Sequence, residues 1–352
     1  MAFQTNVTLD DFELVQKLGE GNFGEVYKAK ENNREEHFAL KKVISEPGVP
    51  IKTLMEEMNI LKNLDHKNII KFFDAGIDGN SIANTKGECF GEGSQIRIGN
   101  KKFRPAYLWF RMELCKRSLK DAIEKKETQN LKFRITTVKQ IVEALKYLRL
   151  KNVAHRDIKP DNILLDVNNV VKLCDFGLAR QMLKPIIGSV TTKGDYTYGN
   201  GTLWFVAPEI LNAGDADKKI PTEWLEKADV YSTGKTWLLM CTTYSIDKRD
   251  IEAIVENYHN GKISDMARGY MVGAEQIMLA CMLNKVRTKR ISVDTLYNEV
   301  VENNLSQCQA MFDKYQQRSR NDTDTSFEDF LVGGWLIAMG GAIALALAAL
   351  RN

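Results

Sequence analysis

The first third of the chain alternates between hydrophobic and polar residues with the period of a β-strand. In residues 37–43, Ala39, Lys41 and Val43 fall on one face of such a strand, and Phe38, Leu40 and Lys42 fall on the other. Residues 12–18 and 26–29 also read as strands. We therefore expect a mostly β unit at the start of the chain.

Later stretches repeat hydrophobic residues with the period of a helix. The first set comprises Ile51, Leu54, Met58 and Leu61. The second set comprises Val138, Ile141, Val142, Leu145 and Leu148. With 352 residues, 44% of them hydrophobic and 27% charged, the chain can build a large core in two lobes. An α+β fold is the expectation.

Two short hydrophobic runs, residues 163–165 and 170–173, flank the turn-forming residues 166–169. This pattern predicts a β-hairpin, which would bring Asn162 and Asp175 together at its open end. An amide oxygen and a carboxylate are hard ligands of the kind that magnesium takes beside substrate phosphates.

Upstream of this hairpin the chain reads His155-Arg156-Asp157, and just after it Asp175-Phe176-Gly177. Together with Asn162, these motifs resemble the catalytic and metal loops of the eukaryotic protein kinases. The resemblance covers roughly residues 12 to 300 and carries expectations for fold, cofactors and site.

The resemblance implies a bilobal protein kinase fold. We expect a small, mostly β N-lobe in residues 12–114 and a larger, mostly α C-lobe in residues 115–300. The cofactors that it implies are ATP and Mg²⁺, with Asn162 and Asp175 as the metal ligands.

A glycine triplet opens the predicted N-lobe at Gly19, Gly21 and Gly24. Glycines at this spacing let a backbone turn approach phosphate oxygens, and they fit a mononucleotide fold as well. In a mononucleotide fold a helix would follow, whereas residues 26–29 read as a strand. Strand, glycine turn and strand resemble the kinase loop that covers ATP.

Lys41 shares its face with the small residue Ala39, which leaves room for an adenine ring beside a cation. The resemblance makes Lys41 the lysine of the α- and β-phosphates, and Glu57 rather than Glu56 its helix partner. A solvated helix glutamate is the alternative interpretation of Glu57. The ATP-binding set implied by the resemblance is Leu18, Gly19, Gly21, Gly24, Val26, Ala39, Lys41, Met112, Glu113 and Cys115.

The resemblance places Asp157 against the incoming hydroxyl group and Lys159 against the transferred phosphate. Lys159 is also typical of the serine/threonine branch of the family. We interpret His155 as a packed structural residue rather than a base. Thr202 matches the threonine that hydrogen-bonds the catalytic aspartate and lysine in serine/threonine kinases.

Arg156 indicates regulation by phosphorylation, because kinases with this arginine commonly use it to bind a phosphate on the activation segment. Thr197 is the expected site. The alternatives are Thr191 or Thr192, or an enzyme that needs no such phosphate.

Further motifs support the C-lobe assignment. Glu209, in Ala-Pro-Glu, is expected to pair with Arg290, and Asp229 to hold the backbone of the catalytic loop. Lys285 and Val286 stand where many family members have Asp-Pro, which puts the substrate-docking surface and the subfamily in doubt.

Residues 76–105 are rich in Gly, Asn and Lys and read as an insert between two N-lobe strands. With the Met-Glu-Leu-Cys sequence that follows, the insert is faintly similar to the kinases of translation initiation factor 2 alpha. Loops vary freely in length, so the subfamily stays open.

A net charge of +3 gives no argument for a nucleic-acid partner, and none is expected. Six scattered cysteines show no metal-ligand spacing and indicate a reducing compartment. No signal segment is recognised at the N-terminus.

The composition changes after residue 304. Residues 305–330 are polar and read as a linker, and residues 331–350 carry no charge over a length that could span a bilayer. We expect a transmembrane tail anchor, with the kinase facing the cytosol at the endoplasmic reticulum or the outer mitochondrial membrane. The alternatives are a core helix that packs on the kinase and a hydrophobic peripheral tail. Small residues recur every fourth position at Gly334, Ala338, Ala342 and Ala346, which is compatible with a homodimer.

Two functions follow from these patterns. The first is a membrane-tethered serine/threonine protein kinase that transfers the ATP γ-phosphate to protein hydroxyl groups. The second is an inactive kinase-like scaffold that binds nucleotide and recruits partners. Scaffolds of that kind usually lack one of Lys41, Asp157 or Asp175, and this chain has all three.

Overall fold

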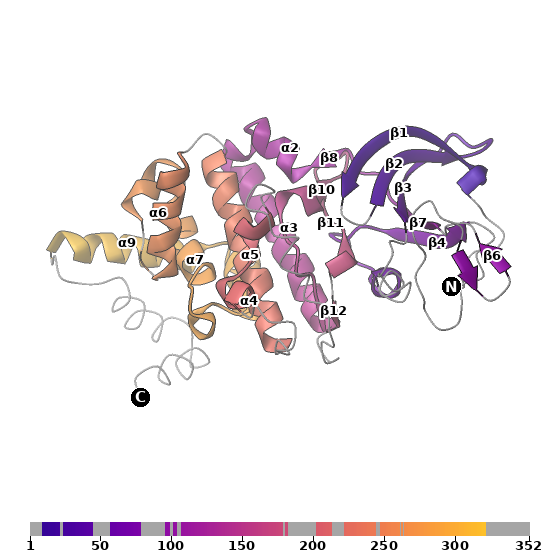
Figure 1. Cartoon of the computed structure of the whole chain (residues 1–352). Coiled ribbons are helices and arrows are strands. Elements are labelled where there is room, and N and C mark those ends of the chain that lie inside the picture. The colour runs from indigo at the N-terminus through magenta and orange to yellow at the C-terminus, as the bar shows by residue number, and fades with distance from the viewer. Residues whose placement is uncertain are drawn as a thin grey trace. The chain divides into compact units, whose positions relative to one another are not determined.

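The computed structural model gives the positions of most of the predicted kinase-like region (Figure 1). It describes residues 9–21, 24–44, 57–78, 96–98, 101–103, 107–178, 180–181, 202–212, 222–243, 247–260, 262 and 264–321. The chain divides into two compact units, Met1–Arg117 with Leu164–Ala179, and Ser118–Ile163 with Arg180–Asn352. Each unit is described by itself.

A five-stranded antiparallel sheet forms the body of the first unit, with the strand order β1-β2-β3-β7-β4. The strands are β1 (Phe12–Gly21), β2 (Gly24–Glu31), β3 (His37–Ile44), β4 (Phe72–Asp78) and β7 (Tyr107–Met112), after a 3-10 turn η1 (Leu9–Asp11). The three strands predicted from alternation are all present.

The alternation along β3 separates two environments, as the sequence predicts. Phe38 and Leu40 belong to a buried cluster with Phe12, Ala29 and Trp109. The ring of Phe12 meets the rings of Phe38 and Trp109 edge-on, at centroid distances of 5.5 and 5.1 Å. Such edge-to-face contacts add to the area burial of the aromatic residues. This cluster stabilises one face of the sheet and leaves the other for Lys41.

The predicted insert lies between β4 and β7, which pair with each other. Within it the structure contains a hairpin of β5 (Ile96–Ile98) and β6 (Lys101–Phe103) that the sequence analysis did not foresee. Strands of three residues are too short to give a clear alternation signal.

The predicted hairpin is present as β10 (Ile163–Leu165) and β11 (Val171–Leu173), in a small sheet with β8 (Arg117–Ser118). Asp166 organises its turn, because Oδ1 accepts hydrogen bonds from the backbone N–H groups of Asn168 (2.7 Å) and Val170 (2.8 Å). A short 3-10 turn η4 (Phe176–Leu178) follows Asp175.

Helices make up most of the second unit. They are α2 (Leu119–Glu124), α3 (Leu131–Leu150), α4 (Pro208–Asn212), α5 (Thr222–Thr242), α6 (Lys248–His259), α7 (Gly273–Met282), α8 (Val293–Tyr297) and α9 (Ser306–Asn321). Shorter elements are β9 (Val153–Ala154), β12 (Arg180–Gln181), the 3-10 turns η2 (Glu127–Gln129), η3 (Pro160–Asn162), η5 (Thr202–Phe205), η7 (Asp265–Gly269) and η8 (Arg287–Lys289), and the π turn η9 (Asn298–Glu302). The predicted hydrophobic stripe of α3 is buried along its whole length.

Buried ion pairing links the helices of this unit. The guanidinium of Arg134 on α3 donates to both carboxylate oxygens of Glu275 on α7, at 2.7 and 2.8 Å. The indole N–H of Trp237 on α5 donates to the same carboxylate at 2.9 Å. Because these three buried side chains are partners of one another, they hold α3, α5 and α7 in a defined register.

The structure differs from the predicted linker at α9. Cys308 and Met311 are buried, and a Cβ atom on Gly273 of α7 would come within 2.2 Å of the ring of Phe312. These three residues follow helical spacing, a signal that the surrounding polar residues obscured. Residues 306–321 are therefore a helix rather than a linker, and its first two turns pack within the second unit.

Within the described part of the chain, which ends at Asn321, no helix is both long and apolar enough to cross a bilayer. The predicted membrane segment, residues 331–350, lies outside the described residues.

Candidate active site

The ammonium group of Lys41 lies between two carboxylates in the first unit. Its Nζ is 2.7 Å from Glu57 Oε1 and 3.0 Å from Asp175 Oδ1. Lys41 and Glu57 are 7% and 4% exposed, so this network is shielded from water. The pairing predicted for Glu57 is present, and Glu57 lies in a helical segment of which residues 57–61 are described.

Burial by itself would lower the pKa of Lys41, but the charges of Asp175 and Glu57 outweigh it and raise that pKa above its ordinary value. The ammonium therefore stays protonated. A buried and permanently charged lysine is suited to hold phosphate oxygens.

Asp175 has a backbone φ of +61°, in the left-handed region that residues other than glycine seldom occupy. Such strain collects where the surrounding structure fixes a functional side chain. The Asp175 side chain keeps 33% of its surface exposed, more than Lys41 or Glu57. It can therefore reach a ligand as well as the lysine.

The glycine loop joins β1 and β2, whose register pairs Gly19 with Val26 and Gly21 with Gly24. Gly24 has a φ of +131°, and a Cβ atom there would lie 2.1 Å from the carbonyl oxygen of Lys42. Only glycine fits this position. Residues 22 and 23, at the tip of the loop, lie outside the described residues.

The predicted adenine-binding residues come together on neighbouring strands. Val26 pairs with Lys41 across β2 and β3, and Ala39 pairs with Met112 across β3 and β7. Ala39 and Met112 are each 8% exposed, which gives this face an apolar lining next to the lysine.

After β7, the N–H group of Glu113 donates to the carbonyl of Lys71 at 2.9 Å. Its carboxylate accepts from the N–H group of Lys71 at 2.7 Å and lies 3.0 Å from Lys172 Nζ. Because the Glu113 N–H group has a partner, its carbonyl oxygen is the backbone group that it can offer to a base. Nearby, burial raises the pKa of the Cys115 thiol to about 12, so this cysteine is not a nucleophile at neutral pH.

In the second unit, the predicted catalytic carboxylate is held by two neighbours. Asp157 Oδ2 accepts from Lys159 Nζ at 2.9 Å and from Asn162 Nδ2 at 2.7 Å. The same amide nitrogen donates to the Asp157 carbonyl at 2.9 Å. These bonds orient the Asp157 carboxylate. Because they use the nitrogen of the Asn162 amide, the amide oxygen is the atom of this side chain that can bind a cation.

Asp229 on α5 fixes the backbone that carries Asp157, as the sequence predicts. Its two carboxylate oxygens accept from the N–H groups of His155 and Arg156, each at 2.8 Å. Burial raises the pKa of Asp229, and these bonds oppose that rise. His155 is fully buried, and its Nδ1 accepts from the Asp157 N–H group at 3.3 Å, in agreement with a structural role.

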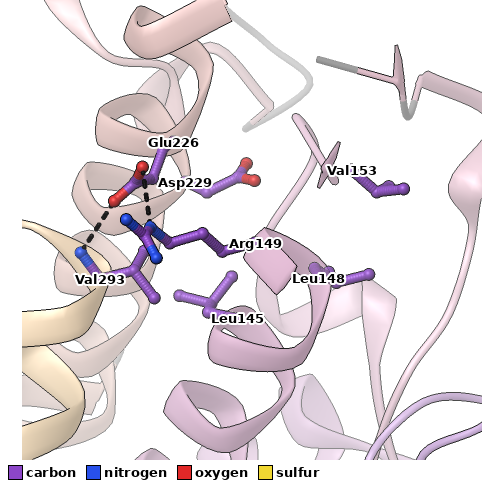
Figure 2. Close-up of a pocket in the computed structure, with 7 residues that line it drawn as sticks. All are labelled: Leu145, Leu148, Arg149, Val153, Glu226, Asp229 and Val293. Carbon is purple, nitrogen blue, oxygen red and sulfur yellow. Dashed lines mark hydrogen bonds and ion pairs between the residues drawn. The ribbon is translucent and has the colours of Figure 1, made fainter. Parts of the chain in front are cut away.

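A small cavity lies beside Asp229 (Figure 2). Its lining is Leu145, Leu148, Arg149, Val153, Glu226, Asp229 and Val293. Figure 2 shows Glu226 bridging two of these residues, with hydrogen bonds from the Val293 N–H group (3.1 Å) and from Arg149 Nε (3.3 Å). At about 10 Å³ the cavity has room for one water molecule, so it is not a nucleotide site.

The predicted pair of Glu209 and Arg290 is also present. Arg290 is 2% exposed, and its two terminal nitrogens donate to Glu209 at 2.6 and 3.0 Å. Further bonds from Arg290 to the carbonyls of Lys227 and Asn284 satisfy the rest of the guanidinium. This bidentate pair fixes the end of the Ala-Pro-Glu segment.

A family model for the protein kinase domain matches residues 12–301. The chain belongs to the protein kinase family.

The kinase is similar to members of more than one subfamily. It is 28% identical over 253 residues to eIF-2-alpha kinase GCN2 of Arabidopsis thaliana, a match covering 64% of this chain and 20% of that protein. It is 32% identical over 219 residues to cyclin-dependent kinase 9 of Danio rerio, covering 60% and 52%. It is 32% identical over 206 residues to cyclin-dependent kinase 12 of Drosophila melanogaster, covering 58% and 16%. The chain thus spans at most about half the length of these relatives, and the subfamily stays unassigned.

Some predicted site residues of the kinase cannot be placed. Thr191, Thr192 and Thr197 lie outside the described residues. Thr202 begins η5, but its side chain is not described, so its predicted bond to Asp157 stays a prediction.

Sequence reasoning missed a second lysine in the kinase, Lys235 on α5. It is 4% exposed, and its Nζ lies 3.6 Å from the ring centroid of Trp204 in η5. The sequence signal that could have pointed to Lys235 is a single lysine within residues 230–240, which carry no other charge.

Proposed function

We propose that this kinase is an ATP-dependent serine/threonine protein kinase. The observation that carries the proposal is the Asp157 carboxylate, which is oriented by Lys159 and Asn162. The backbone beneath it is fixed by Asp229. A carboxylate held in this way can accept the proton of an alcohol.

The reaction is transfer of the γ-phosphoryl group to a protein hydroxyl. The hydroxyl oxygen forms a bond to the γ-phosphorus while the bond to the ADP oxygen breaks, and the hydroxyl proton passes to Asp157. Lys159, next to Asp157, supplies positive charge for the transferred phosphate.

Residues of the first unit are assigned to the nucleotide. The adenine ring would lie against Ala39 and Met112, with Leu18 and Val26 beside it and backbone groups of Glu113 and Cys115 as hydrogen-bond partners. Lys41, which Glu57 and Asp175 keep charged, would hold the α- and β-phosphates.

Magnesium is the implied metal, and the donor set fits it. Among the described residues, no cluster of three or more His, Cys, Asp or Glu side chains could form a cage around a metal ion. One carboxylate and one amide oxygen, from Asp175 and Asn162, suit an ion that shares its shell with phosphates and water. The ion would neutralise charge on the phosphates of ATP.

Serine and threonine are the proposed acceptors, since Lys159 follows Asp157 at the spacing typical of that branch. Asp157→Asn tests the proposal in the full-length chain, with labelled ATP, Mg²⁺ and dephosphorylated casein. We expect a loss of at least about 100-fold in kcat, because the proton acceptor is removed.

The control variant is Asp161→Asn, which changes an exposed aspartate of the same loop and is expected to keep near wild-type activity. Equal transfer by wild type and Asp157→Asn would refute the proposal and favour the scaffold. Phosphoamino acid analysis that finds phosphotyrosine alone would refute the acceptor class.

We also propose that phosphorylation of Thr197 activates the kinase, with Arg156 as the phosphate-binding residue. The support is Arg156, which precedes Asp157 in the chain. Its backbone φ of +69° fixes the course of the chain at this position. Thr197→Ala should lower the activity of the purified kinase. Unchanged activity would refute it.

We propose further that residues 331–350 anchor the kinase in a membrane, with the catalytic domain facing the cytosol, at the endoplasmic reticulum or the outer mitochondrial membrane. The support is twenty residues without a charge. Leu345→Arg should release the full-length chain from phosphatidylcholine vesicles washed with carbonate, and Leu345→Ile should not. Equal retention of all three forms would contradict the anchor.

A homodimer through Gly334, Ala338, Ala342 and Ala346 predicts that Ala342→Leu changes the association state.

A further inference from the structure

Lys235 is a buried cation beside the short element that follows the activation segment. Its Nζ lies 3.6 Å from the ring centroid of Trp204, and the Trp204 ring meets Phe205 edge-on at 5.0 Å. An ammonium over the face of an indole is attracted by the ring, and the attraction grows when water is excluded. The lysine therefore contacts η5 directly.

A second contact from α5 reaches the same element. Ser232 Oγ donates to the carbonyl of Phe205 at 2.9 Å. At its C-terminal end η5 is followed by Ala207-Pro208-Glu209, where Arg290 holds Glu209. This segment thus has two polar anchors, one on its backbone and one on a side chain, and Lys235 supplies the contact to its largest side chain.

The groups around Lys235 leave its charge poorly compensated. On α5, the Tyr231 ring centroid is 6.0 Å from Nζ. On α6, the charge of Glu252 acts on the ammonium, and the ammonium in turn acts on His259. Within the described part of the chain, no hydrogen-bond acceptor of the ammonium is found other than these aromatic faces.

Burial lowers the pKa of Lys235 to about 7, although Glu252 opposes the change. Burial, together with the charge of Lys235, lowers the pKa of His259 to about 4, so this histidine stays neutral near pH 7. His259 Nε2 and the Tyr231 hydroxyl share a hydrogen bond of 2.8 Å, which occupies the tyrosine. Lys235 is therefore the group of this set that changes charge around neutral pH.

We propose that Lys235 is a positioning residue for the protein substrate: by holding the Trp204 ring, its ammonium group sets the orientation of η5 and so the affinity for the polypeptide that carries the acceptor hydroxyl. This inference rests on the proposed kinase function. We assign this role to η5 because it begins at Thr202, the residue predicted to contact Asp157. The segment that follows η5 is held in place by the pair of Glu209 and Arg290.

The proposed role of Lys235 concerns binding of the protein substrate and not binding of the nucleotide. The residues assigned to the adenine ring and to the α- and β-phosphates belong to the first unit, whereas Lys235, Trp204 and Asp157 belong to the second. A change at Lys235 should therefore alter the KM for a protein and leave the KM for ATP nearly unchanged.

Lys235→Met tests this in the full-length kinase, because methionine keeps the apolar length and removes the charge. At about pH 6.3 we expect the KM for dephosphorylated casein to rise about tenfold, as loss of a desolvated cation–π contact implies. Lys235→Arg should restore the KM to within about twofold of wild type, since arginine also stacks on indole. Lys262→Met, at an exposed position of the same unit, is the control.

The dependence on pH gives a second readout. Below pH 7 the ammonium is charged and the contact is present, so the wild-type KM for casein should be low and should rise as the pH increases through about 7. Lys235→Arg should remove this rise, because arginine stays charged. Lys235→Met should have a high KM throughout.

A wild-type KM and pH profile in Lys235→Met would overturn the inference. So would an equal rise in the KM for ATP, which would indicate a general structural role. If wild type transfers no more phosphate than Asp157→Asn, the kinase function itself fails.

The contact between Lys235 and Trp204 is tested separately by the fluorescence of Trp204, measured as the difference between each form and its Trp204→Phe variant. A titration near pH 7 that is absent in Lys235→Met supports the contact, and a flat curve refutes it.

Discussion

Three buried cations of this kinase are compensated in different ways. Lys41 lies between two carboxylates, which raise its pKa despite burial. Arg290 has the bidentate partner Glu209 and two backbone carbonyls. Lys235 faces aromatic rings, and burial lowers its pKa to about 7. A carboxylate partner in a dry site is worth far more than a ring face, and this difference decides which cation keeps its proton.

Glu57→Gln should separate the electrostatic role of Glu57 from its packing. Glutamine keeps the shape but removes the charge, so Lys41 would be drawn to Asp175 and away from phosphate. We expect kcat/KM for ATP to fall by at least about tenfold. Steady-state kinetics with casein measures this, with Glu56→Gln as the control. Equal losses in the two variants would contradict the assignment of Glu57.

Lys235 should also affect stability, in the direction opposite to its effect on substrate binding. Its folded-state pKa is lowered from 10.5 to about 7, so between these values the unfolded chain binds more protons and wild-type stability rises with pH. Below pH 7 the full cost of the buried charge is present. Lys235→Met should therefore be more stable there by about 1–4 kcal/mol, an advantage that shrinks towards pH 10. Urea unfolding at about pH 6.5 and 9 tests this; a constant difference would be incompatible with it.

At the scale of elements, α5 organises the catalytic part of the second unit. Asp229 near its start holds the catalytic loop, Ser232 and Lys235 in the next turns contact η5, and Trp237 joins the Arg134–Glu275 pair. These contacts point to different sides of one helix, which is buried almost all round. The buried helix α5 thus fixes the catalytic loop and η5 relative to the helical core of the second unit.

The contact of α7 with α9 gives a test at this scale. Gly273→Ala should destabilise the kinase by about 1–3 kcal/mol, because the added Cβ would meet the Phe312 ring at 2.2 Å. Gly269→Ala is the matched control, since a Cβ atom there meets nothing within 4 Å. Thermal unfolding measures both, and Phe312→Ala should partly rescue Gly273→Ala. Equal stability of the two glycine variants would contradict the packing of α9.

At the scale of the whole molecule, the two units belong to one kinase domain, because a single family model matches residues 12–301. The residues assigned to the adenine ring and to the α- and β-phosphates lie in the first unit, and the carboxylate assigned to the hydroxyl lies in the second. Activity should therefore be lost when the assigned residues of either unit are changed.

Magnesium is the metal of the proposed mechanism. Chelation with excess EDTA should abolish phosphate transfer, and added Mg²⁺ should restore it. The increase in melting temperature on adding ATP with Mg²⁺ should be smaller in Asp175→Asn than in wild type, because binding stabilises the folded state by mass action. An unchanged increase would contradict the assignment of Asp175 to the metal.

The sequence by itself determined the family, three strands of the first sheet, the α3 stripe and the partners Glu57, Asp229 and Glu209. Local periodicity and spaced polar residues carry such information, because side-chain direction repeats along each element.

Tertiary structure alone decided the contacts of residues far apart in the chain. It placed Lys235 on Trp204, Arg134 on Glu275 and Phe312 on Gly273. It also formed the short hairpin of β5 and β6 and made α9 from a polar stretch. The physical reason is that burial and charge compensation depend on which elements pack together, and a lysine in a sequence carries no mark of its neighbours in space.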